Sequence, residues 1–421
     1  MIPVLKEKFK DSKIIVLHID KSFPVNDVPV LYSEEPAQVQ AFLEKELPEI
    51  DSSMIKIIEW RPSMNFYKEK YVKLLSQTVE FIKRREAEKR TTAVFGKRWI
   101  ANFFKNLKII NRTVLYKTAD VPVIVTGSGP GLETAIPLIN KVQDNCIIIA
   151  ASSSILALSK NGISADIVIA TDGGSWALRH VYPMFRTCTD SSLAVNLCAA
   201  LPSQCADKPF LILNDGSLWQ NIILHELELP SVIIPQRGTV TASAVELAIV
   251  LTGGGVFLAG ADLSVRDIRT HVRPYSFDYL FSCSADRFSP FYSKSFFRSA
   301  QMKDGGSMDI YAAWFKNQLE LWPKRIFSVA AGGGIFKNAV PFKQENKKKE
   351  GLFKSVNVKG SPGKFCERAL SAIYSAMKNP EYAGSIKNEL TPLLFPGKKE
   401  VTEKEMETAL LETIKTGDVN V

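Results

Sequence analysis

Short apolar runs alternate with helical stretches between about residues 118 and 340, and this alternation constrains the fold more than any other feature. We expect strands at 121–126, 146–151, 166–171, 193–197, 209–213, 231–235, 255–259 and 326–330. Strands that alternate with helices form βαβ units, in which helices cover both faces of a parallel sheet. The pattern therefore predicts an α/β, Rossmann-like fold with a mostly parallel sheet.

A glycine-rich turn, Gly127-Ser128-Gly129-Pro130-Gly131, joins the first of these strands to a helix expected at 132–142. Glycine lets a backbone or a phosphate approach closely, and a helix N-terminus favours an anion. The spacing is not G-x-G-x-x-G, and the Lys-Ser/Thr pair of a Walker loop does not follow. The turn suits nucleotide binding, and an ordinary tight turn between strand and helix is the alternative.

Polar residues and glycines also follow other predicted strands. They are Ser152 and Ser153, then Asp172 and Gly173, then Arg237, Gly238, Thr239 and Thr241, and finally Asp262. The carboxyl ends of parallel strands share one edge of a sheet, where ligands bind, so we expect a single cleft there. Each residue has a structural alternative, because serine, threonine and aspartate cap helices and Asp-Gly forms turns.

His271 lies in an Arg-rich segment that we interpret as a loop over the strand ends. Loops held by a rigid sheet often carry catalytic groups. An imidazole with a pKa near 6.5 accepts a proton at neutral pH, which makes His271 a candidate general base and a packing histidine the alternative.

The flanking regions differ in character from the centre. Residues 1–117 are predicted to form an accessory α/β domain, 118–345 the Rossmann-like catalytic domain and 346–421 a helical C-terminal region. The expected accessory elements are strands at 14–17, 28–31 and 55–58, a helix at 36–46, and helix over 65–110 with a break near Gly96. Near the C-terminus we expect helices at 365–377 and 402–416, the second opened by a Thr402–Glu405 capping box.

Composition excludes several classes of protein. The net charge is +9, with basic clusters at 83–85, 89–90, 97–98 and 347–349, but no nucleic-acid motif accompanies them. The six cysteines form no C-x-x-C and the four histidines are well separated, so we expect no disulfide framework and no metal site. No apolar run suffices to span a bilayer and no signal core follows Met1, so we expect a cytoplasmic protein.

In order, these motifs resemble the central domain of motility-associated factor (Maf) proteins over about residues 119–340. The matching stretches are Gly127 to Pro130, Asp172, the run Gly238-Thr239-Val240-Thr241-Ala242-Ser243-Ala244-Val245-Glu246-Leu247-Ala248, Gly260-Ala261-Asp262-Leu263 with Thr270-His271, Tyr311-Ala312-Ala313-Trp314-Phe315, and Ala330-Ala331-Gly332-Gly333-Gly334. The same core is similar to Rossmann-like bacterial sialyltransferases and, more distantly, to archaeal 6-hydroxymethylpterin diphosphokinases of the MptE-like group.

The resemblance implies a glycosyltransferase that moves a nonulosonic (pseudaminic, legionaminic or sialic-type) sugar from its cytidine-monophosphate (CMP) donor to Ser/Thr of flagellin, for flagellum assembly and motility. The expected mechanism uses no metal or other cofactor. The donor phosphate is expected on the N–H groups of Gly127 to Gly131 or of Gly238 to Thr241, with Arg237 offsetting anionic charge.

Three side chains are expected to carry the chemistry. Asp172 or Asp262 would stabilise the positive charge of an oxocarbenium-like transition state or hold the sugar, and His271 would take the acceptor proton. Related sialyltransferases carry their base histidine just before the segment equivalent to 309–321, and Ala300 to Ser307 contain none here.

Two other functions stay open at this point. One is an MptE-like pyrophosphokinase that uses ATP and Mg²⁺, with Asp304 and Asp309 as a possible carboxylate site. The other is a non-catalytic assembly protein that binds flagellin through the flanking regions.

Overall fold

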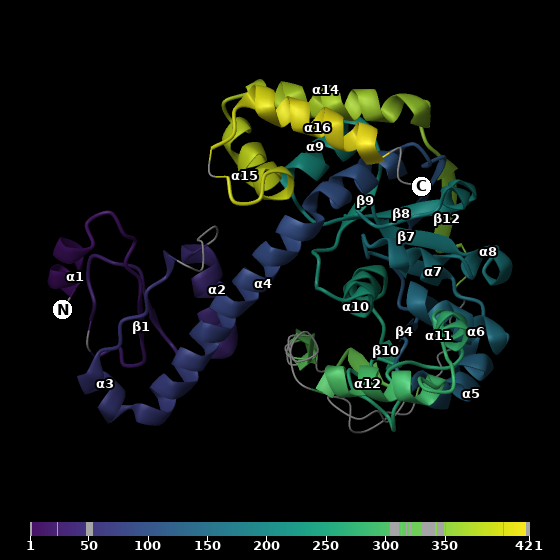
Figure 1. Ribbon diagram of the computed structural model, residues 1–421, viewed down its shortest axis with the longest axis horizontal. Coiled ribbons are helices and arrows are strands. Elements are labelled where there is room, and N and C mark those ends of the chain that lie inside the picture. Colours follow the sequence, from purple (N-terminus) through teal and green to yellow (C-terminus); the bar gives the residue numbers. More distant parts are fainter. Residues whose placement is uncertain are drawn as a thin grey trace. The chain divides into compact units, whose positions relative to one another are not determined.

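The computed structural model describes residues 2–22, 24–47, 54–303, 311–312, 314–316, 318–319, 322, 324–329, 342, 349, 351–398 and 400–417. The chain divides into two compact units, Met1–Val94 and Phe95–Val421 (Figure 1). The division falls within helix α4 (Lys68–Leu107) rather than at the predicted boundary at residue 117. The predicted C-terminal region, 346–421, forms part of the second unit.

Unit 1 contains a small two-stranded sheet and several helices. The elements are α1 (Ile2–Lys8), β1 (Val16–His18), β2 (Val30–Tyr32), α2 (Pro36–Glu46), α3 (Arg61–Phe66) and the first part of α4. β1 and β2 pair in parallel, and α2 packs Val39 and Leu43 against α4. The predicted helix at 36–46 is confirmed, whereas the predicted strand at 55–58 is wrong, because Ile57 and Ile58 are exposed and pair with no strand among the described residues.

Unit 2 is built on a ten-stranded sheet. Its order is β11 (Ile326–Ser328), β10 (Val256–Ala259), β4 (Val123–Thr126), β5 (Ile147–Ala151), β6 (Ile167–Ala170), β7 (Ser192–Asn196), β8 (Pro209–Asn214), β3 (Arg112–Tyr116) and β12 (Phe353–Asn357), with β9 (Ser231–Ile233) also on β8. Every pair is parallel except β12 with β3. The mostly parallel sheet is confirmed, and all the strands predicted between 118 and 340 are present.

Two strands were not predicted. β3 comes from the region assigned to the accessory domain and β12 from the region assigned to helices, yet both belong to the central sheet. The sheet therefore extends beyond 118–345 at both ends of that range.

The direction in which the sheet grows reverses at β4. From β4 the chain adds β5, β6, β7 and β8 on one side, and then returns to place β10 on the other side. The pairs Val123 with Val256 and Thr126 with Ala259 set the register of β4 and β10. Such a reversal creates a crevice at the carboxyl ends of the strands, which is the usual ligand site of an open α/β sheet.

Helices cover both faces of the sheet, as the Rossmann-like prediction requires. They are α5 (Leu132–Val142), α6 (Ile155–Lys160), α7 (Leu178–Val181), α8 (Met184–Thr187), α9 (Leu218–Glu226), α10 (Val240–Leu251), α11 (Asp278–Cys283), α12 (Phe291–Lys303), α14 (Phe365–Lys378), α15 (Ala383–Leu394) and α16 (Glu403–Gly417). Successive residues of β5 enter opposite cores: Ile148 packs with α5 and α9, and Ile149 packs with α10. This alternation follows from the two-residue period of a strand.

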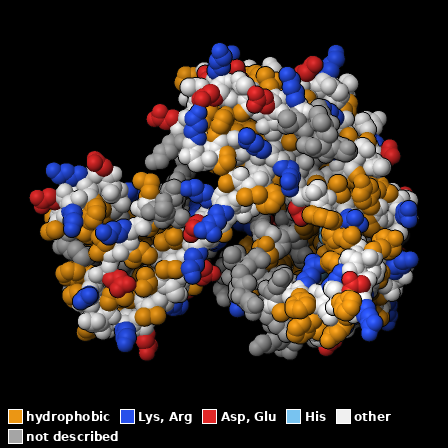
Figure 2. All heavy atoms as spheres, viewed as in Figure 1, with side chains coloured by type: hydrophobic (Ala, Val, Ile, Leu, Met, Phe, Trp, Pro, Cys, Tyr) orange, Lys and Arg blue, Asp and Glu red, His pale blue; other side chains and the backbone are white. Residues whose placement is uncertain are grey.

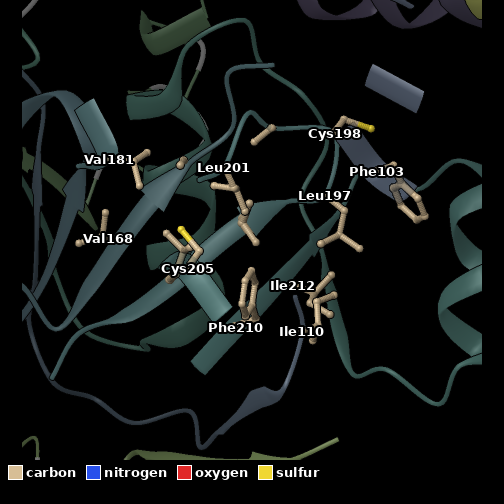
Figure 3. Close-up of a cluster of buried hydrophobic side chains, with 14 of the residues drawn as sticks. Phe103, Ile110, Val168, Val181, Leu197, Cys198, Leu201, Cys205, Phe210 and Ile212 are labelled. Atoms are coloured by element: carbon tan, nitrogen blue, oxygen red, sulfur yellow. The ribbon is translucent and has the colours of Figure 1, made fainter. Parts of the chain in front are cut away.

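The second half of α4 lies in the larger core. Figure 3 shows Phe103 beside Leu197, with Ile110 against Ile212 beneath them. The predicted break at Gly96 is wrong, because α4 continues through it. A Cβ on Gly96 would lie 2.5 Å from the carbonyl oxygen of Leu393, so this glycine allows α4 to approach α15 closely.

The C-terminal helices complete the same core. The Cys366 thiol donates to the Phe104 carbonyl (3.1 Å), and α14 packs along α9. The Thr402–Glu405 capping box is confirmed, with the Thr402 N–H donating to Glu405 (2.9 Å) and the Glu405 N–H donating to Thr402 Oγ1 (3.3 Å). Helix α15, with Pro392 inside it, was not predicted.

Candidate functional site

The parallel strands bring the predicted residues to one edge of the sheet. Gly127 follows β4, Ser152 follows β5, Asp172 comes two residues after β6, and Gly260 follows β10. These four strands are neighbours in the order β10-β4-β5-β6. The edge therefore presents the strand ends in the arrangement that the sequence predicts.

The glycine turn after β4 packs against the turn after β10. The Gly127 N–H donates to the Ala259 carbonyl and the Gly129 N–H to the Gly260 carbonyl, each at 2.8 Å. A Cβ on Gly127 would lie 2.5 Å from the Gly260 carbonyl oxygen, so only glycine fits this approach. Since Pro130 has no N–H, these bonds leave the turn few donors for a phosphate.

Asp262 fills the space that the glycines leave. Its carboxylate accepts from the Gly131 N–H at the start of α5, and a Cβ on Gly129 or Gly131 would lie 2.4 or 2.2 Å from it. The residue is 7% exposed; burial raises the pKa of its carboxyl group, while the Gly131 N–H and the charge of Arg266 lower it. Asp262 thus occupies the place before α5 where an anion would otherwise bind, although the N-cap residue of that helix is Gly131 and not Asp262.

The start of α10, residues Gly238 to Thr241, is a second candidate anion-binding site beside the same turn, and it is called the α10 cradle below. Thr239 caps this helix by accepting from the Ala242 N–H (3.0 Å). The N–H groups of Val240 and Thr241 have no acceptor within the helix, because they belong to its first turn. A Cβ on Gly127 would lie 3.1 Å from Thr241 Oγ1, so this helix start lies at the point where the sheet reverses.

Two neighbours shape this cradle. Gly238 has a φ of +75°, and a Cβ there would lie 2.8 Å from the ring of Tyr311. Arg237 Nε donates to Glu246 of α10 (2.7 Å). Burial raises the pKa of Glu246, whereas the charge and the hydrogen bond of Arg237 lower it. Among the described residues, the hydrogen bond found for the Arg237 guanidinium uses Nε.

His271 lies on the loop that follows β10. The N–H of the next residue, Val272, donates to the Ser128 carbonyl (2.8 Å), and Arg269 pairs with both oxygens of Glu133 on α5 (2.8 and 2.9 Å). These contacts hold the loop against the glycine turn.

The His271 ring is packed rather than free. It stacks on Tyr275 with 4.1 Å between centroids, and its Nδ1 is 2.8 Å from Thr270 Oγ1. Burial, together with the charges of Arg298 and His180, lowers the pKa of His271 to about 3. The imidazole is therefore neutral at pH 7, and it is a weaker base than a free histidine.

His180 is a second histidine in this cluster that the sequence did not single out. Its Nε2 is 3.4 Å from the Tyr275 hydroxyl, and its Nδ1 is buried without a partner in the described part of the chain. Burial lowers the pKa of His180 to about 4, against the opposing charge of Asp172. Its position eight residues after Asp172 was the signal available in the sequence.

The remaining predicted residues form turns. Asp172 is exposed, and its carboxylate accepts from the Gly174 N–H (2.8 Å). Ser152, which is 5% exposed, and the half-buried Ser153 belong to a 3₁₀ turn that leads into α6. The carboxylate pair Asp304 and Asp309 lies outside the described residues.

A pocket of about 390 Å³ lies further along the same edge, at the carboxyl ends of β7, β8 and β9. It is lined by Trp99, Cys198, Asp215, Trp219, Gln220 and Gln236, together with Ser217 and Leu393. None of these residues is among the predicted site residues, although Gln236 directly precedes Arg237. The predicted Gly173 lies behind the pocket, because a Cβ there would be 2.5 Å from Trp99 Cδ1.

Hydrophobic side chains gather on the surface over α12 (Figure 2), where Tyr292, Phe296 and Phe297 are exposed.

Among the described residues, no three His, Cys, Asp or Glu side chains lie together as metal ligands would. In the same part of the chain, no helix combines the length and apolar character needed to cross a bilayer.

Comparison with known proteins finds related sequence and fold. Residues 97–267 match the family model "6-hydroxymethylpterin diphosphokinase MptE-like". An uncharacterized protein of Treponema pallidum (strain Nichols) is 28% identical over 279 residues, which is 66% of this chain and 60% of that protein. This chain thus spans about 60% of the length of that relative.

The fold is similar to that of the MAf glycosyltransferase from Magnetospirillum magneticum AMB-1. The TM-score is 0.52 at 14% identity, and the match covers 99% of this chain and 71% of the other. At this identity the likeness concerns the fold.

Proposed function

We propose that this chain is a glycosyltransferase of the Maf/MptE-like family, because residues 97–267 match the MptE-like family model and the fold is similar to that of a MAf glycosyltransferase. In this proposal it moves a nonulosonic acid from a CMP-activated donor to a Ser/Thr hydroxyl of flagellin. The donor carries two anionic groups, a phosphate and a sugar carboxylate, and the acceptor contributes a neutral hydroxyl.

One observation carries the proposal: the start of α10 lies beside the turn after β4, and no hydrogen bond from the Val240 or Thr241 N–H is found among the described residues. The N–H groups of Val240 and Thr241 belong to a 12-residue helix, whose dipole favours a phosphate at that end. Arg237 precedes the first residue of α10 by three residues, and the terminal amino groups of an arginine suit a second anionic group. The turn at Gly127 to Gly131 is a poorer phosphate site, because three of its N–H groups, those of Gly127, Gly129 and Gly131, already donate to Ala259, Gly260 and Asp262.

One bond breaks and one bond forms at the anomeric carbon in the proposed transfer. The bond between the anomeric carbon and the phosphate oxygen breaks, and its electron pair leaves with CMP. The acceptor oxygen bonds to the anomeric carbon and loses its proton to His271. Asp172 is the better of the two predicted carboxylates for the developing positive charge, because it is exposed while Asp262 is buried against Gly131.

Nucleotide binding is tested first. Thermal shift should show stabilisation by CMP and not by ATP with Mg²⁺. Val240→Pro removes one N–H at the first helical position, where proline keeps the helix intact, and should weaken CMP binding by roughly 10- to 100-fold. Val240→Ala keeps that N–H and is the matched control; equal CMP affinity in the two variants would remove the cradle from the proposal.

Transfer is tested with flagellin and a CMP-activated nonulosonic acid, read out as intact flagellin mass. His271→Ala should keep CMP binding and lose roughly 10²–10⁴-fold in rate. The exposed His225→Ala is the control. Full activity of His271→Ala would exclude His271 as the base, and the same assay on His180→Ala would then test the neighbouring ring.

The description of the matching family model favours one other activity, a pyrophosphokinase that uses ATP on a pterin-like substrate. Stabilisation by ATP with Mg²⁺ but not by CMP would support it. An unchanged flagellin mass in a strain that lacks this protein would exclude the transferase and leave a flagellin-binding assembly role.

A further inference from the structure

The pocket at the ends of β7, β8 and β9 has the size and lining of a ligand site. Its volume of about 390 Å³ lies within the range of small-molecule pockets. Two indole rings, Trp99 and Trp219, line it, and Trp219 is fixed by Phe103 at 4.7 Å between ring centroids. The pocket is built by residues other than those of the α10 cradle.

Two buried polar atoms of this pocket have no hydrogen-bond partner among the described residues. Gln220 is 1% exposed and donates through Nε2 to Asp215 Oδ2 (2.8 Å), while its Oε1 has no partner within the described ranges. Ser217 Oγ is buried and unpartnered in the same sense. Buried polar groups in folded proteins are normally hydrogen-bonded, so an amide oxygen and a hydroxyl of this kind favour a ligand that donates hydrogen bonds.

The charge of the lining narrows the ligand class. Asp215 is the ionisable carboxylate of the pocket, and its oxygens accept from the Ser217 N–H (2.9 Å) and from Gln220. Among the described residues that line the pocket, none is Lys or Arg. A phosphate or carboxylate ligand would be repelled there, which separates this pocket from the cradle for the donor phosphate.

Cys198 does not provide a nucleophile in this pocket. Burial, reinforced by the charge of Asp215, raises the pKa of its thiol well above the ordinary value. The thiol therefore stays protonated and contributes a small apolar wall. The pocket is suited to binding rather than to covalent chemistry.

We propose that this pocket binds a neutral, hydroxyl-rich group, namely a sugar ring. Indole faces pack on the C–H faces of a sugar, and the amide, hydroxyl and carboxylate oxygens of Gln220, Ser217 and Asp215 accept from its hydroxyls. The inference goes beyond the proposed transfer of a charged sugar, because it needs neither donor nor nucleotide. It predicts a second, neutral carbohydrate ligand.

Ligand-detected NMR and tryptophan fluorescence on the full chain test this directly, without nucleotide. The probes are the methyl glycosides of glucose, galactose and mannose, with N-acetylneuraminic acid as anionic and choline as cationic probe. We expect saturable binding of at least one neutral glycoside, and this binding should persist when the anionic probe, which suits the proposed donor site, is present. Binding of choline alone, or of no neutral glycoside, would overturn the proposal.

Variants locate the site. Gln220→Met keeps the volume, removes the amide and should weaken glycoside binding by roughly 10-fold. Gln236→Ala, at an exposed lining position, is a second variant that leaves the core intact and should also weaken binding. Trp60→Phe in unit 1 is the fluorescence control. Glycoside binding unaffected by both pocket variants would overturn the assignment, whereas the CMP result bears only on the proposed transferase.

Discussion

Acid should destabilise unit 2 through two buried histidines. Burial and nearby positive charge lower the pKa of His271 to about 3, and burial lowers the pKa of His180 to about 4. In the unfolded chain both rings titrate near 6.5. A folded pKa below the unfolded value adds stability that is present above pH 6.5, and this stability is lost as the pH falls toward the folded values.

The magnitude follows from proton linkage. At pH 5 the unfolded rings are almost fully protonated, while the folded rings remain neutral. Each histidine should therefore lower the free energy of unfolding by about 2 kcal/mol between pH 7 and pH 5. This figure is insensitive to whether the folded pKa is about 3 or about 4, because both lie well below pH 5. Together the two rings account for about 4 kcal/mol, a large part of typical domain stability.

Urea unfolding at pH 7 and pH 5 measures the effect. His271→Asn and His180→Asn should each lose about 2 kcal/mol less than the parent between the two pH values. Carboxyl groups that titrate in the same window are common to all the proteins, so the comparison between variants cancels them. His225→Asn, at an exposed position, is the matched control for the substitution itself. If His271→Asn and the parent lose the same free energy, burial of that ring in its neutral form is refuted.

Three further predictions concern the packing around the site. Gly96→Ala should lower the free energy of unfolding by about 1–3 kcal/mol, because its Cβ would meet the Leu393 backbone. Gly384→Ala, at an exposed helical position with open space around it, should raise the free energy of unfolding by roughly 0.5–1 kcal/mol. Urea unfolding of the two variants measures both changes, and equal effects would contradict the contact between Gly96 and Leu393. Thr239→Ala should cost about 1 kcal/mol through loss of the α10 cap, and Thr239→Ser should restore it; thermal unfolding that shows no difference would argue against the cap. Asp262→Ala should cost about 1–3 kcal/mol by leaving the Gly131 N–H unpaired, while Asp262→Asn keeps an acceptor and should cost less; an equal loss of stability in both would count against that bond.

Local patterns were sufficient for most of the sheet and several helices. The eight central strands follow from short apolar runs, and α2 and α5 coincide with their predicted ranges. β3 and β12 were not predicted, because they pair with each other across more than 200 residues. Neither β12 nor the outward side of β3 is buried as the central strands are. The helix break predicted near Gly96 is absent, because close packing against Leu393 outweighs the low helix propensity of glycine.

The amino-acid sequence by itself determined the class of fold and the edge of the sheet where polar residues gather, because strand period, helix period and turn chemistry act between near neighbours. Only the tertiary structure decided which backbone donors stay open at that edge. Asp262 accepts from the Gly131 N–H across 131 residues, the start of α10 lies beside the turn that contains Gly127, and the rings of His180 and His271 both contact Tyr275. Those outcomes depend on contacts between distant segments, whose burial sets both the free hydrogen-bond donors and the protonation of the side chains.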